Sequence, residues 1–290
     1  MPRVSIVLPC YNGSRYLRYS LDSILIQDFT DWELIFVNDC STDDTLKIAT
    51  EYANKDARIR IINNETNQKL PASLNIGFSA ATGDYLTWTS DDNIAKPNWL
   101  SVMVEYLDRN QDTDMVVAGM DYIDEDGNVF DTFNYKRRAQ DLSYFCNVGA
   151  AFMYRRRIMD KIGGYDTSVF CAEDYDYWCR IAMSGRIDYI SDNIYQYRFN
   201  SDALTAKEQP RIQQKTLAIQ RKYRDDFIRH FNMGYWSRVK LSYLSMDRIW
   251  RPEYIILDTY KFLSRQLVNI LFFWSKKYRK SVFRKIQIRL

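Results

Sequence analysis

The amino-acid sequence predicts an α/β fold, with a doubly wound, mostly parallel sheet flanked by helices and a helical, basic C-terminal extension. Short apolar, β-branched runs alternate with helical patterns, which is typical of such sheets. Polar clusters directly follow several of these runs. The charge also changes sign, because residues 231–290 hold 13 Lys/Arg against 3 Asp/Glu, whereas the rest of the chain holds 27 against 34. We therefore expect two parts, 1–205 and 206–290.

Each element is predicted by its own pattern. Apolar runs predict strands, and apolar residues spaced three or four apart predict helices. In chain order, the expected strands are 4–8, 33–37, 59–62, 85–89, 115–120, 149–154 and 187–190, with a hairpin turn at 125–128. Helices are expected at 17–25 and around 46–49, from Pro71 to 81, after Pro97, and at 155–162. Residues 195–205 are expected to form a polar loop.

Several classes of protein are disfavoured by what the sequence lacks. Neither a G-x-G-x-x-G nor a G-x-x-x-x-G-K-S/T loop is present, which disfavours dinucleotide-binding oxidoreductases and P-loop enzymes. The single histidine, His230, disfavours Ser–His–Asp chemistry and histidine-bound metals. The five cysteines lack C-x-x-C spacing, so we expect free thiols in the cytoplasm. We expect neither a signal peptide after Met1 nor an apolar run of the roughly 20 residues that span a bilayer.

One stretch, residues 85–97 (YLTWTSDDNIAKP), joins a buried strand to a cluster of acids. Asp91 and Asp92 repel each other while the strand tethers them to the core. A hard divalent cation such as Mg²⁺ or Mn²⁺ would relieve this repulsion. The alternative is a solvated loop whose acids cap the next helix. In a doubly wound sheet, ligands bind beyond the carboxyl ends of the strands, which is where this cluster would lie.

Four segments resemble the inverting nucleotide-sugar glycosyltransferases of family 2, which have the GT-A fold. They are VSIVLPCYNGSRYLRYSLDSIL, WELIFVNDCSTDDT, ATGDYLTWTSDDNIAKPNWL and GGYDTSVFCAEDYDYWCRI, in the family's order and spacing. The resemblance covers roughly residues 2–205 and does not extend to the basic tail.

The resemblance implies a nucleotide site at the ends of the first two strands. Pro9, Tyr11 and Asn12 stand where the family holds the base and ribose. Asp39 matches the carboxylate that accepts a hydrogen bond from the base. A carboxylate accepts from the imide N–H of uracil or thymine, so uridine or thymidine diphosphate sugars are favoured. The alternative for Asp39 is a local Asx turn.

The resemblance also implies a site for Mn²⁺ or Mg²⁺. The metal-binding Asp at the end of the family's Asp-x-Asp motif aligns with Asp92, whereas the first Asp is replaced by Ser90. Asp91 could supply the missing oxygen, toward the ribose or a metal-bound water. Many relatives carry a metal-assisting His in a Tyr-Arg-x-His loop, where this chain has Asn200, whose side chain offers a carbonyl oxygen.

The catalytic base implied by the resemblance is Asp174, in AEDYDYW. A base takes the proton of the acceptor hydroxyl while that hydroxyl attacks the anomeric carbon from the face opposite the diphosphate. Glu173 and Asp176 compete for this role by proximity, and the acids could instead only stabilise a helix N-terminus. Tyr177 and Trp178 either stack on a sugar or pack in the core.

The extension combines Leu, Ile, Phe and Trp with Lys and Arg, which favours a peripheral helix against anionic lipid at the inner face of the cell membrane. The alternatives are a helical cap on the catalytic domain and a dimer helix. No nucleic-acid motif accompanies the basic residues, so we expect no nucleic-acid partner.

Together these features predict a metal-dependent inverting glycosyltransferase of polysaccharide biosynthesis. It would move a sugar from a nucleotide-diphosphate donor, with UDP-sugars favoured, to a hydroxyl of a surface-glycan or lipid-linked acceptor. A nucleotidyltransferase is one alternative, although its Gly-rich basic loop is poorly matched by CYNGSRY. A non-catalytic glycan- or membrane-binding protein that retains the fold is the other, and Ser90 and Asn200 favour it.

Overall fold

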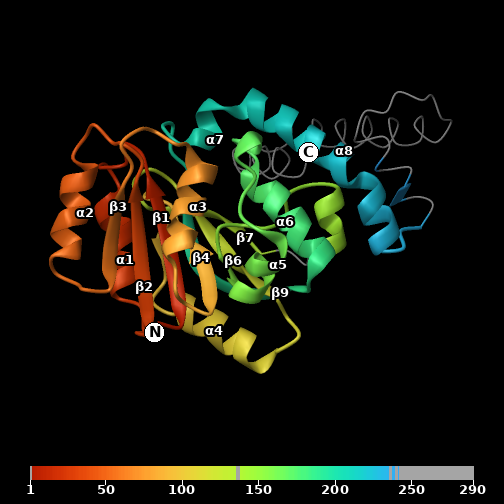
Figure 1. Ribbon diagram of the computed structural model, residues 1–290, viewed down its shortest axis with the longest axis horizontal. Coiled ribbons are helices and arrows are strands. Elements are labelled where there is room, and N and C mark those ends of the chain that lie inside the picture. Colours follow the sequence, from red (N-terminus) through yellow and green to blue (C-terminus); the bar gives the residue numbers. More distant parts are fainter. Residues whose placement is uncertain (1, 135–137, 235–236, 239–240, 242–290) are drawn as a thin grey trace, which may run out of the picture. The chain divides into compact units, whose positions relative to one another are not determined.

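The computed structural model describes residues 2–134, 138–234, 237–238 and 241 (Figure 1). The chain divides into two compact units, Met1–Ile219 and Gln220–Leu290, with the boundary inside helix α8 (Gln209–His230). The first unit contains all the predicted site residues and is described here. The division at 205/206 stays a prediction, and most of the basic extension, 242–290, lies outside the described residues.

A mixed sheet forms the centre of the first unit (Figure 1). Its described strands follow the order β3-β2-β1-β4-β8-β6-β9-β5, with β7 paired to β6. Four of them are parallel to one another: β3 (Ile59–Asn63), β2 (Trp32–Asn38), β1 (Val4–Cys10) and β4 (Tyr85–Trp88). Every residue of β1 and β2 is buried, as expected for strands covered on both faces. The predicted doubly wound α/β fold is confirmed.

The remaining strands extend the sheet beyond β4, and they pair with their neighbours in both parallel and antiparallel directions. β8 (Phe152–Arg155) is antiparallel to β4 and to β6 (Met115–Ile123), and β7 (Val129–Phe133) is antiparallel to β6. β9 (Ile187–Arg198) is parallel to β6, and β5 (Ile94–Ala95) is antiparallel to β9.

The prediction that a loop begins at Tyr195 is wrong, because β9 continues to Arg198. Tyr195 is buried, pairs with Ala95 and packs on the ring of Trp99, 5.5 Å away. The strand therefore continues because these residues pair with neighbouring strands and are at least partly buried there, although their sequence is not apolar. The extension brings residues 198–202 to the end of β4.

Helices cover both faces of the parallel strands. On one face, α1 (Leu17–Leu25), α2 (Thr45–Ala53) and α4 (Trp99–Arg109) share a core with Val4, Ile6 and Leu8 of β1. On the other face lies α3 (Leu70–Ala80), where a Cβ at Gly77 would be 2.4 Å from Val7 Cγ1. Further helices are η1 (Ala139–Ser143), α5 (Arg156–Ile162), η2 (Thr167–Val169), α6 (Glu173–Ser184) and α7 (Leu204–Lys207).

The parallel strands end together. Cys10 at the end of β1 pairs with Asn38 at the end of β2, and Val7 pairs with Trp88 at the end of β4. We call this side of the sheet the carboxyl edge, and the side where the same strands begin the amino edge. Within the part of the chain that the structure describes, no helix combines the length and the hydropathy needed to cross a bilayer.

Candidate active site

Asn12 ties together the loops that follow β1 and β2. Its backbone N–H donates to Ser41 Oγ over 3.0 Å, and its Oδ1 accepts from the backbone N–H of Thr42 over 2.8 Å. Asn12 and Tyr11 are exposed at the carboxyl edge, the latter with 54% of its surface accessible. Pro9 is buried within β1. Of these three residues, Tyr11 and Asn12 therefore have a surface that a ligand could contact directly.

Asp39, directly after β2, is buried and receives three hydrogen bonds. Its Oδ1 accepts from the backbone N–H of Gln68 (2.7 Å) and from Asn64 Nδ2 (2.8 Å). Its Oδ2 accepts from the backbone N–H of Lys69 over 2.9 Å. These donors belong to the loop between β3 and α3, so Asp39 does not form the Asx turn that was its alternative role. A carboxylate has about four lone-pair sites, and one remains for a further donor.

Among the described residues of the first unit, four non-glycine residues hold a positive φ, and they lie in the loops after β1, β2 and β3 or directly before α6. They are Asn12 (56°), Cys40 (63°), Lys69 (71°) and Cys171 (79°). Lys69 also has a ψ of 162°, a combination that is essentially restricted to glycine. Strained backbone of this kind clusters at functional sites, and it marks the carboxyl edge independently of any sequence motif.

Asp91 and Asp92 follow β4, and the pKa values of both are raised. Asp91 packs against Gly13, where a Cβ would lie 1.8 Å from Asp91 Oδ2. Burial and the neighbouring charge of Asp92 raise the pKa of Asp91 to about 7, and burial also raises the pKa of Asp92. No side chain caps the N-terminus of α4, so these acids do not serve as its cap. A nearby cation would lower both pKa values.

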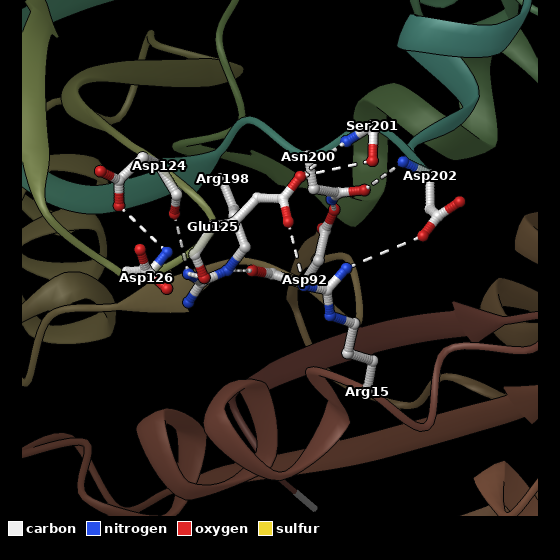
Figure 2. A network of polar contacts seen from close by, with 9 residues as sticks. All are labelled: Arg15, Asp92, Asp124, Glu125, Asp126, Arg198, Asn200, Ser201 and Asp202. Carbon is white, nitrogen blue, oxygen red and sulfur yellow. Dashed lines mark hydrogen bonds and ion pairs between the residues drawn. The ribbon is translucent and has the colours of Figure 1, made fainter.

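Asn200 reaches Asp92 from the end of β9 (Figure 2). Its Nδ2 donates to Asp92 Oδ2 over 2.8 Å, and its Oδ1 accepts from the backbone N–H of Asp202 over 2.9 Å. The structure therefore brings together the two residues predicted to bind a metal. The carbonyl oxygen of Asn200 faces its own loop, so the amide must turn over before that oxygen can face a cation beside Asp92.

Asp174 lies in the first turn of α6 and retains some exposed surface. Its Oδ1 accepts from the backbone N–H of Tyr175 over 2.7 Å, while burial raises its pKa. The competing acids are less accessible. Glu173 is buried, and burial and the charge of Asp174 raise its pKa to about 7. Asp176 is fully buried and paired with Arg180 over 2.9 Å. Accessibility therefore favours Asp174 as the acid that contacts a substrate.

Two tyrosines connect Asp174 with the end of β4. Burial is the main cause that raises the pKa of Tyr197. The charges of Asp92 and Asp174 raise it further, so both carboxylates lie within electrostatic range of one phenol. Tyr165 accepts a hydrogen bond from Trp88 Nε1 over 3.1 Å, and the charge of Asp174 contributes to the raised pKa of Tyr165. The acids of β4 and α6 thus face a shared region.

The two aromatic residues with open roles pack in the core. Trp178 is 1% exposed, and Tyr177 is completely buried with its ring stacked on Tyr165 at 4.0 Å. Neither ring has a face available for a sugar.

The donor set fits a cation that arrives together with a diphosphate. Across the described residues, no group of three or more His, Cys, Asp or Glu side chains could hold a metal by itself. Mg²⁺ is usually bound through one or two carboxylates plus substrate phosphates, rather than by an all-protein cage. Asp92, with Asp91 beside it, supplies hard oxygen atoms of this kind, and burial raises the pKa of both carboxyl groups.

Arg198 is the residue of the site whose importance sequence reasoning missed. It is 3% exposed, and its Nε donates to the backbone oxygen of Asp92 over 2.9 Å. The signal was its place between Tyr197 and Phe199, because a lone arginine in an aromatic strand end must find buried acceptors.

The fold and the acidic carboxyl edge define a protein of the glycosyltransferase class. The model of glycosyl transferase family 2 matches residues 5–163, and the chain belongs to this family. EpsE of Bacillus subtilis, whose name places it among the glycosyltransferases, is 34% identical over 70% of this chain and 75% of its own length. The uncharacterized glycosyltransferase MJ1057 of Methanocaldococcus jannaschii is 33% identical over 68% of this chain and 71% of its own.

Solved structures support the GT-A fold. TarS of S. aureus, in complex with UDP, matches with a TM-score of 0.61 at 21% identity, over 76% of this chain. The chain spans 65% of that TarS chain, slightly less than two thirds. The mannosyltransferase PcManGT of Pyrobaculum calidifontis, in complex with GDP-Man and Mn²⁺, matches with a TM-score of 0.63 at 18% identity, over 97% of this chain and 83% of its own.

Proposed function

We propose that this chain is a metal-dependent, inverting glycosyltransferase. It transfers a sugar from a nucleotide-diphosphate donor, with uridine as the favoured base, to a hydroxyl of a surface-glycan or lipid-linked acceptor. The observation that carries the proposal is that Asp92 lies at the carboxyl edge with Asn200, whose Nδ2 donates to Asp92 Oδ2 over 2.8 Å, while the charges of Asp92 and Asp174 both contribute to the raised pKa of Tyr197. This proximity supports a diphosphate at Asp92 and an acceptor hydroxyl at Asp174.

The proposed nucleotide site lies between the loops that follow β1 and β2. Asp39 has one lone-pair site left, which suits the imide N–H of uracil. The exposed ring of Tyr11 and the exposed Asn12 lie on the neighbouring loop. A guanine N–H would satisfy the same acceptor, and PcManGT was solved with GDP-Man whereas TarS was solved with UDP-GlcNAc. GDP-sugars are therefore the comparison for the proposed UDP specificity.

Mn²⁺ or Mg²⁺, when bound, would neutralise charge on the leaving diphosphate. Asp92 would hold the cation together with Asn200, and Asp91 would supply an oxygen toward the ribose or a metal-bound water. Asp174 takes the proton of the acceptor hydroxyl while the oxygen of that hydroxyl attacks the anomeric carbon. Its raised pKa makes it a stronger base than an ordinary aspartate. Attack from the side opposite the diphosphate inverts the anomeric centre.

A thermal-shift screen tests the donor proposal. UDP-, dTDP- and GDP-sugars are each added with Mn²⁺, with Mg²⁺ and with EDTA, and the compounds that bind are then assayed for hydrolysis. We expect UDP-sugars to raise the melting temperature only when a divalent cation is present. Equal shifts in EDTA would contradict the metal dependence, and a response restricted to GDP-sugars would contradict the uridine assignment.

The acceptor side of the proposal includes a membrane surface. The excess of 13 Lys/Arg over 3 Asp/Glu in residues 231–290 supports contact with anionic lipid. Cosedimentation of the full chain with vesicles of phosphatidylcholine alone and with added phosphatidylglycerol measures this contact. We expect binding to the anionic vesicles only, and it should weaken with salt.

A further inference from the structure

Arg198 connects three separate segments at the carboxyl edge, and Figure 2 shows its contacts with two of them, at Asp92 and at Asp124 and Glu125. Its Nε donates to the backbone oxygen of Asp92 over 2.9 Å. One of its terminal nitrogens donates to the backbone oxygens of Asp124 (3.0 Å) and Glu125 (2.9 Å), in the turn between β6 and β7. Its guanidinium also lies over the ring of Tyr16, 4.6 Å from the centroid. A single buried cation thus joins the segments that follow β1, β4 and β6.

We propose that Arg198 is a positioning residue that fixes the carboxylate of Asp92 for a metal-bound diphosphate. The proposal rests on the proposed function, because the site that it organises is the proposed donor site. Arg198 holds the backbone of Asp92 directly, and two residues later Asn200 holds its side chain through Oδ2. The backbone N–H of Arg198 also donates to Asn93 Oδ1 over 3.0 Å. Asp92 is therefore held from both sides by one short segment of the chain.

The geometry of arginine is essential to this role. Its acceptors are backbone oxygens that point at one centre from two different loops, and a planar guanidinium can donate to all of them together. Lysine keeps the positive charge but has a single nitrogen on a flexible stem. Arg198→Lys should therefore preserve the charge of the site while leaving the loop of Asp92 less well fixed. Partners that orient metal ligands typically change affinity by about 10- to 100-fold when they are altered.

Arg155 provides a matched control at the amino edge. It too is buried, its Nε donates to the backbone oxygen of Thr113 over 2.8 Å, and a terminal nitrogen donates to the backbone oxygen of Leu107 over 2.6 Å. Its guanidinium lies over the ring of Tyr85, 5.4 Å from the centroid. Arg155→Lys removes the same kind of contact without touching the carboxyl edge, so it measures the purely structural cost of the substitution.

Calorimetric titration of the full chain with UDP in Mn²⁺, and with GDP in Mn²⁺, tests the proposal. We expect Arg198→Lys to weaken Mn²⁺-dependent binding by at least about tenfold, and Arg155→Lys to leave it unchanged although both lower the melting temperature. Wild-type affinity in Arg198→Lys would overturn the proposal. Equal weakening in Arg155→Lys would also overturn it, because the weaker binding would then result from the lower stability that both variants share.

A second variant addresses the case in which Arg198→Lys does not fold. Asn200 is partly exposed, so Asn200→Ser should fold and should weaken the same Mn²⁺-dependent binding. If both single variants fold, their effects should be less than additive in the double variant, because both act through Asp92. Unchanged binding in Asn200→Ser, or full additivity, would contradict the proposed route through Asp92.

Hydrogen exchange separates this inference from the proposed function. If the wild-type chain binds neither UDP nor GDP in the presence of Mn²⁺, the proposed function fails. The positioning role is then judged by exchange in peptides covering 89–95 and 199–205. Arg198→Lys should speed exchange in both segments, whereas Arg155→Lys should not. Unchanged exchange in Arg198→Lys overturns the inference whatever the ligand.

Discussion

The acids at the two edges of the parallel sheet have pKa values shifted in opposite directions. At the amino edge, Glu33 accepts from Ser5 Oγ and from the backbone N–H and hydroxyl of Thr82, each over 2.7 Å, and pairs with Arg60 over 2.6 Å. Burial alone would raise the pKa of Glu33, yet these partners lower it. At the carboxyl edge, burial and Asp92 raise the pKa of Asp91 to about 7. A fully paired acid indicates structure, and an uncompensated one indicates a site for a ligand.

Backbone strain shows the same contrast. In the first unit, the described non-glycine residues with positive φ lie in loops after β1, β2 and β3 or directly before α6. None of those described lies in a connection at the amino edge. Strain persists where surrounding contacts hold it, and the contacts of Asp39 with the loop before α3 are an example. The carboxyl edge thus differs from the amino edge both in its acids, whose pKa values are raised, and in its backbone, which is strained.

The largest effect is expected at Asp174. Asp174→Asn removes a base but keeps the size of the side chain, so transfer to the acceptor should fall by about 10²- to 10⁴-fold. Binding of the nucleotide sugar should persist, which calorimetry can establish. The paired acid Asp176 is the control, because Asp176→Asn breaks a buried ion pair and should lower the melting temperature instead. Unchanged turnover in Asp174→Asn would remove Asp174 from the role of base.

A pair of substitutions tests the contrast between the two edges directly. Asp92→Ala should abolish Mn²⁺-dependent nucleotide binding with little loss of stability. Glu33→Gln should cost about 1–3 kcal/mol of stability, since it disrupts charged hydrogen bonds, and should leave binding intact. Calorimetry measures nucleotide binding by each variant, and thermal denaturation measures the stability of each. Full binding by Asp92→Ala in Mn²⁺ would show that the metal assignment is wrong.

The sequence was sufficient for most of the strands and helices along the chain, although not for β5, and for the acids that follow β2 and β4. Periodic apolar residues fix the elements, and parallel strands must end on one side, so Asp39 and Asp92 had to lie near each other. It could not show which acid of Glu173, Asp174 and Asp176 keeps an exposed surface. That choice depends on how α6 packs, which buries the other two.

The end of β9 and the strained residues were beyond sequence reasoning for a different reason. The run Tyr195–Arg198 looks polar, and only the neighbouring strands reveal that it is buried. Arg198 therefore seemed to belong to a loop, although its contacts organise the site. In the same way, nothing in the letters around Lys69 indicates its positive φ, nor that its backbone N–H donates to Asp39.

The raised pKa of Asp91 gives a prediction for stability against pH. In the unfolded chain Asp91 ionises near its ordinary pKa of about 4, whereas in the fold it ionises at about 7. Ionisation therefore favours the unfolded chain, and the folded state loses stability as the pH rises through this window. Asp91→Asn removes this loss. Its melting temperature should therefore exceed that of the wild type at pH 8, by roughly 2–4 °C for each kcal/mol of stability regained.

The pH dependence supplies the control for Asp91→Asn. At pH 4 most of the difference between the two proteins should disappear, because the carboxyl of the folded wild type is then protonated. Saturating Mn²⁺ should stabilise the wild type more at pH 8 than at pH 5. A melting temperature of Asp91→Asn below that of the wild type at pH 8 would mean that the acid is paired, like Glu33, and would remove the contrast between the edges.

The smallest effect is expected from relief of strain at Lys69, whose φ of 71° and ψ of 162° suit glycine. Such a conformation costs of order 1–3 kcal/mol, and glycine loses about 0.5–1 kcal/mol through the entropy of the unfolded chain. Lys69→Gly should therefore stabilise the fold by about 0.5–2 kcal/mol in denaturant unfolding. Lys69→Ala removes the same amine but keeps the strain, so it should bring no gain. Equal stability of the two variants would show that the backbone of the carboxyl edge stores no strain at this residue.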